Sequence, residues 1–276
     1  MLFMLRRMST HNRLTEYEQE FGRDSTALSR MCRTATDLVY DAHADRIKNG
    51  LELFASSFPT FAQKIHDKGV EMLPEGSAFQ AVDQNISEFI DGTNFDLARM
   101  DGRNNMQETF YDGHKKKHAV VFQGVVTPNG ILTDLSGPYP GRRHDEYMVT
   151  ASHVNERMRD CQAGNLLQYK LMGDKAYTVR SHIGRPFVGN DLSPEQVGFN
   201  LSLSRLRVSV EHIFGKMKVM SALVTWKAEM KLFASPVGRY FVNAAILANC
   251  HTCLNGSVVG QYFDCDPPSI HDYLGV

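Results

Sequence analysis

Apolar and polar positions predict a helical first part of the chain, followed by strands. Residues 13–47 carry apolar side chains at helical spacing, with a turn at 22–25 after which a longer helix begins at Asp24 or Ser25. Apolar runs of strand type follow at 86–90 and 117–128. An Asn-Gly pair at 129–130 then predicts a hairpin turn into a third strand at 131–140.

The second half of the chain alternates between helix and strand. A helix is predicted for 144–162 and a fourth strand for 169–177, before an irregular stretch that contains Pro186 and Pro194. An amphipathic helix runs from Leu203 to Leu223, and the hydrophobic segment 237–253 predicts a helix that covers the core. Together these elements predict an α/β fold with a mixed sheet.

Three acidic residues lie where such a fold would bring them together. Asp91 and Asp174 each close a predicted buried strand, where an unpaired carboxylate is costly, and Glu211 lies on the amphipathic helix. Taken singly, each acid is better explained by solvation or an ion pair, because the chain has 31 Asp and Glu residues. Taken together, three convergent carboxylates can hold two Mg²⁺ ions for attack on a phosphodiester. The acids therefore indicate a nuclease or transposase core.

Two basic residues flank Glu211 on its helix. Arg207, Glu211 and Lys218 are separated by four and seven positions, which places them on one helix face beside the apolar stripe. Phosphate binding next to metals needs such cations, but an Arg and Glu pair four residues apart is also a common helix-stabilising contact. The residues alone leave both interpretations open.

Four ordered motifs carry a resemblance to a known family. They are "FIDGT", "PGRRHDEYM", "LMGDKAY" and "FNLSLSRLRVSVEHIFGKMK". Over roughly residues 86–250 the chain resembles the catalytic domain of PIF/Harbinger-type DDE transposases and the nucleases derived from them. The resemblance implies an RNase H-like mixed sheet flanked by helices, with Asp91, Asp174 and Glu211 as metal ligands for Mg²⁺, or Mn²⁺ as a substitute. It also implies a metal-dependent DNA endonuclease or transposase.

The resemblance extends to residues around the triad. The spacing of Arg207 and Lys218 about the glutamate is similar to that in related bacterial transposases, and the two would bind DNA phosphates, as would Arg143 and His144. Asp145, the next residue after His144, is either an accessory metal ligand or the N-terminal cap of the predicted helix. The chain departs from the family pattern at Ser204, where relatives have Tyr, and at Ala176, where they have Gly.

The predicted domain organisation has three parts. They are a helical region at 1–85, an RNase H-like nuclease domain at 86–250 and a C-terminal tail at 251–276. In relatives a DNA-binding helix-turn-helix precedes the nuclease domain, so residues 13–47 are expected to form a truncated version of it. Its second helix would meet DNA through Ser25, Ser29, Arg30 and Arg33, while a plain helical hairpin is the alternative.

Charge and composition limit the remaining interpretations. A net charge of −1 gives no overall attraction to DNA, so a basic footprint must be local, at 114–118, 142–143 and 205–218. No run approaches the roughly 20 apolar residues that span a membrane. Cys250, Cys253, Cys265 and His271 have zinc-ligand spacing, although reduced buried thiols explain the five cysteines more simply.

The resemblance also implies partners and a compartment. It implies DNA as substrate, an accessory DNA-binding protein as partner and the nucleus as location, with no membrane partner. The alternative is a catalytically silent, domesticated transposase that binds DNA or protein. A phosphatase or a structure-selective nuclease on the same fold is a third interpretation.

Overall fold

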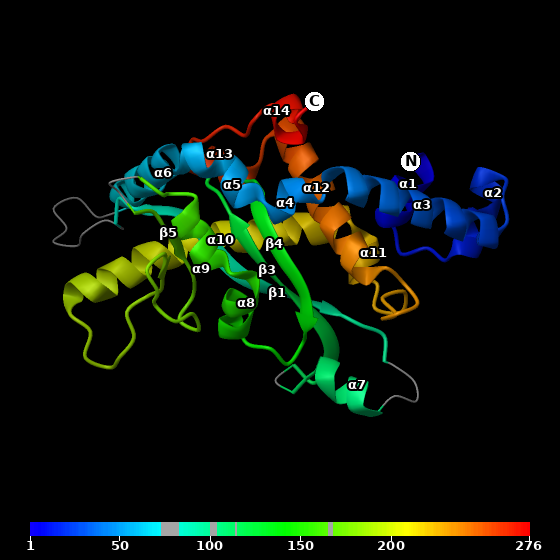
Figure 1. Ribbon diagram of the computed structural model, residues 1–276, viewed down its shortest axis with the longest axis horizontal. Coiled ribbons are helices and arrows are strands. Elements are labelled where there is room, and N and C mark those ends of the chain that lie inside the picture. Colours follow the sequence, from blue (N-terminus) through cyan, green and yellow to red (C-terminus); the bar gives the residue numbers. More distant parts are fainter. Residues whose placement is uncertain (73–82, 100–103, 114, 165–167) are drawn as a thin grey trace.

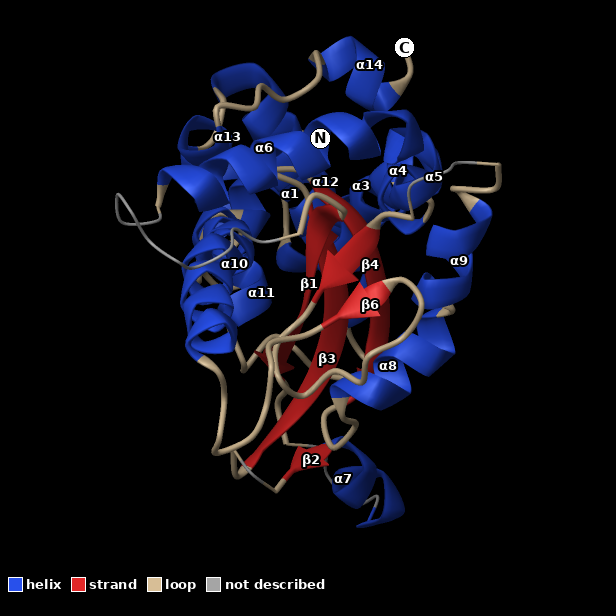
Figure 2. Cartoon of the chain, turned by 90° about the vertical axis from the view of Figure 1, so that its left-hand side faces the viewer, coloured by secondary structure: helices blue, strands red, loops and turns tan. Residues whose placement is uncertain are grey.

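A mixed sheet with helices on both sides forms the centre of the protein (Figures 1 and 2). The computed structural model describes residues 1–72, 83–99, 104–113, 115–164 and 168–276, and only the backbone at 104–106. The strands are β1 Ile86–Asp96, β2 Tyr111–Asp112, β3 Lys117–Val126, β4 Leu132–Pro140, β5 Lys170–Met172 and β6 Ile183–Gly184.

The order of the strands defines the fold. It is β2-β3-β1-β5-β6, with β4 paired to β3. β1 is antiparallel to β3, with Asp91 opposite Gly124, and β1, β5 and β6 are mutually parallel. The predicted hairpin is present, because β3 and β4 pair antiparallel across the turn at Gly130. The sheet and its flanking helices confirm the RNase H-like α/β fold.

Helices cover both faces and one end of the sheet. In Figure 2, α10 (Pro194–Met220) lies on one side of the sheet, and α8 (Asp145–Ser152) and α9 (Val154–Asp160) lie on the other. The first helices are α1 Leu2–Met8, η1 Leu14–Tyr17, α2 Glu18–Phe21, α3 Ser25–His43, α4 Asp45–Lys48, α5 Gly50–Phe54, η2 Ala55–Ser57 and α6 Phe58–Glu71. The others are α7 Asn104–Phe110, α11 Ala222–Thr225, α12 Val237–Asn255, α13 Val258–Phe263 and α14 Ile270–Leu274.

One hydrophobic core joins residues from all three predicted parts. Leu28 of α3, Phe241 of α12 and Phe263 of α13 are buried members of the same cluster. α12 crosses residue 250, and the residues predicted as a tail form α13 and α14, which pack back on α10 and α12. The boundaries at 85 and 250 therefore separate stretches of sequence that share a core.

Capping residues explain where the two long helices begin. The Asp24 carboxylate accepts a hydrogen bond from the Ala27 amide, so α3 begins where the sequence predicts. α10 begins earlier than Leu203, because Ser193 and Gln196 form a capping box and Pro194 occupies the first turn. The predicted helix at 144–162 is broken in two at His153, which has a φ of 52°.

β4 is protected along the edge that does not pair with β3. The Asn249 side chain accepts from the Leu132 amide at 3.0 Å and donates to the Leu132 carbonyl at 2.8 Å. The backbone of α5 also packs directly on the strand, since a Cβ atom at Gly50 would collide with the Thr133 carbonyl oxygen. Two helices thus cover this part of the strand.

Glu88 on β1 is completely buried, and this burial gives a pH-dependent prediction. Burial raises its pKa to about 8, although Thr133 donates a hydrogen bond to Oε1 at 3.0 Å. Between about pH 4.5 and 8 the folded chain holds a proton that the unfolded chain has lost, so stability falls by about 1.4 kcal/mol per pH unit. The Glu88→Gln variant should lack this loss and gain stability relative to wild type as the pH rises.

Urea unfolding of both proteins at pH 5, 7 and 9 measures the effect of Glu88. The Glu71→Gln variant is the control, because that carboxylate is 67% exposed and its removal should leave the pH profile unchanged. A constant difference between wild type and Glu88→Gln from pH 5 to pH 9 would show that Glu88 ionises normally.

Candidate active site

Four aspartates line one pocket of about 630 Å³. Asp112 of β2 accepts hydrogen bonds from the Asn94 side chain and the Lys115 backbone amide, and the other three are Asp91, Asp145 and Asp174. Asp91 comes from β1, Asp145 from the first position of α8, and Asp174 from the segment that follows β5. The basic side chains that line the same pocket are Lys115, Arg142, Arg143 and His144. The pocket therefore combines an acidic centre with a basic wall.

Asp91 lies within β1 and not at its end, because pairing with β3 continues to Asp96. The prediction that it closes a strand is wrong in this respect. Burial raises the pKa of Asp91 to about 6, the charges of Asp174 and Asp145 act in the same direction, and Arg207 lowers it. The Arg207 Nη2 atom is 3.7 Å from Asp91 Oδ2, and the Gly92 amide donates to Oδ1 at 2.9 Å.

Asp145 faces β1 across Gly92. A Cβ atom at Gly92 would lie 2.8 Å from Asp145 Oδ1 and 3.1 Å from Met148 Cε, so only glycine leaves room for this carboxylate. The residue that caps α8 is His144, without a side-chain hydrogen bond. The interpretation of Asp145 as a helix cap is therefore wrong. Burial first, and then the charge of Asp174, raise the pKa of Asp145.

The Gly92→Ala substitution should displace the Asp145 carboxylate and leave β1 intact. If Asp145 takes part in cation binding, the affinity for Mg²⁺ should fall about tenfold, as is usual when a ligand is misplaced. Calorimetric titration with Mg²⁺ measures this. Gly113→Ala is the matched control, since Gly113 lines the same pocket and a Cβ atom there would meet open space. Equal affinities of the two variants would exclude a role for Asp145.

Asp174 is held by a tight turn after β5. Its Oδ1 accepts a hydrogen bond from the Ala176 amide at 2.8 Å, and its carbonyl accepts from the Tyr177 amide at 3.3 Å. The turn brings the Tyr177 ring against Gly173, where a Cβ atom would collide with it. Glycine, aspartate and tyrosine at these positions thus form one local unit that aims Asp174 into the pocket.

Tyr177 and Gln123 belong to the surroundings of the pocket, and the sequence interpretation missed both. Tyr177 is fully buried, and burial together with the charges of Asp145, Asp91 and Asp174 raises its pKa well above the usual value. Gln123 Nε2 donates to the Tyr177 hydroxyl at 3.5 Å, and Ser152 donates to Gln123 Oε1 at 3.1 Å. The available signal was a glutamine inside the apolar run of β3.

α10 brings Arg207 to Asp91 but leaves Glu211 apart from the aspartates. Arg207 is 17% exposed, and its Nε atom has no hydrogen-bond partner among the described residues. Glu211 is exposed and does not line the aspartate pocket. Lys218 lies farther along the helix, with Nζ 4.8 Å from the centre of the Phe95 ring. The assignment of Glu211 as a metal ligand rests on the resemblance.

The donor chemistry of the pocket suits a hard divalent cation. In the part of the chain that the structure describes, no three side chains of His, Cys, Asp or Glu are arranged to hold a metal ion. Asp91, Asp145 and Asp174 nevertheless offer only carboxylate oxygens, and the negative charges of Asp145 and Asp174 raise the pKa of Asp91. A cation bound between them would relieve that repulsion, so these residues fit Mg²⁺ in chemical type.

The predicted DNA-contacting residues of α3 lie apart from the aspartate pocket. Ser29, Arg30 and Arg33 are exposed, while the Ser25 amide donates to Glu18 Oε1 at 2.7 Å. α3 packs on α1 and α12, and the short elements η1 and α2 come directly before it. The helix-turn-helix therefore stays a prediction.

Other sequence expectations are distributed over the structure. His114 lies outside the described residues, Lys115 lines the aspartate pocket, and Lys216 donates to the Thr252 hydroxyl at 2.7 Å. The five cysteines are free thiols, and the cysteines near residue 250 join no metal cluster within the described ranges. Among the helices that the structure describes, none is long and apolar enough to cross a membrane.

The fold and the pocket define the class of protein. It is an RNase H-like protein with aspartates clustered on strand β1 and next to it. The chain belongs to the DDE superfamily endonucleases, whose sequence profile matches residues 90–249, more than half of its length. No curated protein and no solved structure matches the sequence of this chain. The family consists of nucleases and transposase-like proteins, with DNA as substrate and divalent metals as cofactors.

Proposed function

We propose that this chain is a PIF/Harbinger-type, metal-dependent DNA endonuclease that cuts phosphodiester bonds with Asp91, Asp174 and Glu211. The observation that carries the proposal is the shared pocket of Asp91 and Asp174, together with the match to the DDE superfamily. The motifs that extend from "FIDGT" to the glutamate helix support the PIF/Harbinger type.

The residues of the pocket have separate roles in this proposal. Asp91 and Asp174 would hold Mg²⁺, with Asp145 as an additional oxygen donor and Glu211 of α10 as the third member of the family triad. Bound Mg²⁺ would lower the pKa of the attacking water or 3′-hydroxyl and stabilise charge on the leaving oxygen. Arg207 favours the ionised form of the Asp91 carboxylate, because its guanidinium opposes the rise in pKa that burial causes.

The basic wall of the pocket suits the DNA backbone. Arg143 and His144 lie at the start of α8 next to Asp145, where they bind phosphates near the cut. Lys218 and Arg207 bind phosphates along α10. Ser25, Ser29, Arg30 and Arg33 of α3 contact DNA farther away, with an accessory DNA-binding protein as partner and the nucleus as location.

A plasmid-nicking assay tests the proposal. Wild-type protein should nick supercoiled DNA with Mg²⁺ or Mn²⁺ but not with a chelator, and Asp174→Ala should reduce the rate by about 100-fold or more, equivalent to about 3 kcal/mol. Asp191→Ala is the control, since Asp191 is an exposed loop residue after β6. Nicking that persists in the chelator would contradict the proposal. DNA binding without nicking or metal-induced thermal stabilisation would support the catalytically silent alternative.

A further inference from the structure

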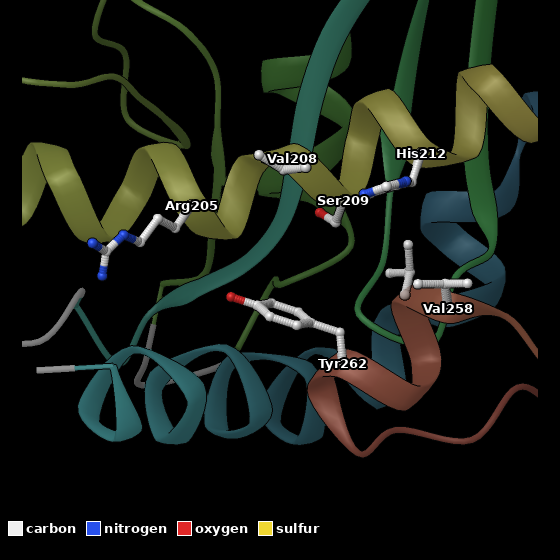
Figure 3. Close-up of a pocket in the computed structure, with 7 residues that line it drawn as sticks. Arg205, Val208, Ser209, His212, Val258 and Tyr262 are labelled. Atoms are coloured by element: carbon white, nitrogen blue, oxygen red, sulfur yellow. The ribbon is translucent and has the colours of Figure 1, made fainter.

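A second cavity, of about 220 Å³, lies between α10 and α13, away from the aspartates (Figure 3). α10 supplies four of its lining residues and α13 the remaining three. They are Arg205, Val208, Ser209, His212, Val258, Val259 and Tyr262. Arg207 and Glu211, which the nuclease proposal uses, are absent from this lining. The cavity is therefore a separate feature of α10.

The walls of this cavity are apolar. Val208 and Val258 are 42% and 68% exposed, so apolar surface that a folded chain normally covers remains open here. The Tyr262 ring lies between α10 and α6 in Figure 3, and Lys68 of α6 lies over it at 4.8 Å. A cavity of about 150 Å³ can hold a benzene ring, so 220 Å³ suits a body of one or two rings.

Ser209 places an unpaired hydroxyl in this apolar cavity. Ser209 is only 5% exposed, yet its Oγ atom has no hydrogen-bond partner among the described residues. A serine within a helix usually bonds the carbonyl four residues earlier, and a buried hydroxyl without a partner is costly. A ligand that accepts a hydrogen bond from Ser209 would remove this cost.

The charge around the cavity favours an anion. Arg205 lies one helical turn before Ser209 on α10, and His212 lies at the other end of the cavity (Figure 3). None of the seven lining residues, all of them described, is acidic. A carboxylate that accepts a hydrogen bond from Ser209 would therefore have Arg205 as its nearest cation on α10, one helical turn away.

We infer that this cavity binds a small aromatic carboxylate. The ring packs between the valines and Tyr262, and the carboxylate accepts a hydrogen bond from Ser209, with Arg205 at the end of the cavity as its counter-charge. Small-ligand sites typically have such a composition, with apolar walls and a few convergent polar groups. The inference is independent of the nuclease proposal, since it uses neither the aspartates nor a metal.

Indole-3-acetate is a suitable probe, and methyl NMR of valine-labelled protein reports its binding. The methyl signals of Val208, Val258 and Val259 should shift and saturate with a dissociation constant on the order of 0.1–1 mM. 3-Methylindole, which lacks the carboxylate, should bind about tenfold more weakly. Arg205→Gln should lower the affinity for indole-3-acetate about tenfold and leave the affinity for 3-methylindole unchanged. Arg159→Gln, at an exposed position, should change neither affinity.

The Ser209→Ala variant separates a ligand-binding role from a structural one. The variant should keep or raise the thermal midpoint of unfolding, because an unpaired buried hydroxyl is removed. Its affinity for indole-3-acetate should fall about fivefold. Val258→Trp should fill the cavity and block binding, while Val219→Trp, at an 83% exposed position of α10, should not. The inference fails if the valine signals do not saturate, if Val258→Trp binds normally, or if Ser209→Ala loses stability without losing affinity.

Discussion

Replacing Asp91 with asparagine should reduce metal-dependent DNA cleavage by about 1000-fold, which corresponds to about 4 kcal/mol of transition-state stabilisation. The reason is that the Asp91 carboxylate lies 3.7 Å from Arg207 and interacts electrostatically with Asp145 and Asp174, so its loss removes an oxygen donor to which the other charged groups of the proposed site are coupled. Nicking rates at saturating Mg²⁺ measure the effect. The fold should survive, because a neutral amide is no less compatible with burial than a carboxylate whose pKa is raised to about 6.

Two comparisons make the Asp91→Asn result specific. Asp96→Asn changes an acid at the far end of the same strand, where Asp96 pairs with Lys117 at 2.5 Å, and should cut DNA normally. Without metal, Asp91→Asn should be at least as stable as wild type above pH 6. The raised pKa means that wild type loses stability as the pH rises from about 4 to 6. Cleavage at the wild-type rate would remove Asp91 from the mechanism.

Arg157→Met should destabilise the protein by about 3 kcal/mol at pH 8 and by less at pH 5. Arg157 donates to Asp134 at 2.6 Å and twice to Glu52 at 2.8 Å, which connects α9 with β4 and α5. Burial raises the pKa of Asp134 to about 7, so the carboxyl is protonated at pH 5 and charged at pH 8. Without Arg157 that charge has no counterion in the core, and urea unfolding at both pH values measures the cost.

The double variant Asp134→Asn with Arg157→Met identifies the cause of this loss. It should be more stable than Arg157→Met alone at pH 8, because the unpaired buried charge is gone. Arg159→Met should change stability by less than about 0.5 kcal/mol, since its side chain is 63% exposed. Equal stability of the single and double variants would mean that Arg157 acts through packing and not through charge.

Local patterns in the sequence predicted the elements that depend on near neighbours. The apolar run before Asn129 and Gly130 predicts the β3-β4 hairpin, and the apolar stripe that includes Leu206 and Val210 predicts α10. The early start of α10 was also present as a signal, because Ser193 precedes a proline and Gln196 follows three residues later. The prediction places Pro194 in an irregular stretch, although proline is favourable in the first turn of a helix.

The arrangement of the pocket depends on contacts between distant segments, which one sequence does not show. Asp145 lies against Gly92 only because α8 packs on the sheet, and nothing near Asp145 in the sequence indicates this contact. Asp91 looks like the end of a strand because polar residues follow it, yet pairing with β3 continues the strand. Glu211 matches the family motif by position, while its distance from the aspartates is set by how α10 packs on the sheet.

The covered edge of β4 restricts how two copies of this protein can associate. An open edge strand is a template on which a second chain can add its own strand, a common route to dimers and to aggregation. Here the Leu132 amide and carbonyl already bond the Asn249 side chain, and the backbone at Gly50 blocks approach to Thr133. Self-association through a sheet that continues across both chains is therefore blocked at Leu132 and Thr133, so a dimer must form at another strand edge or through another surface.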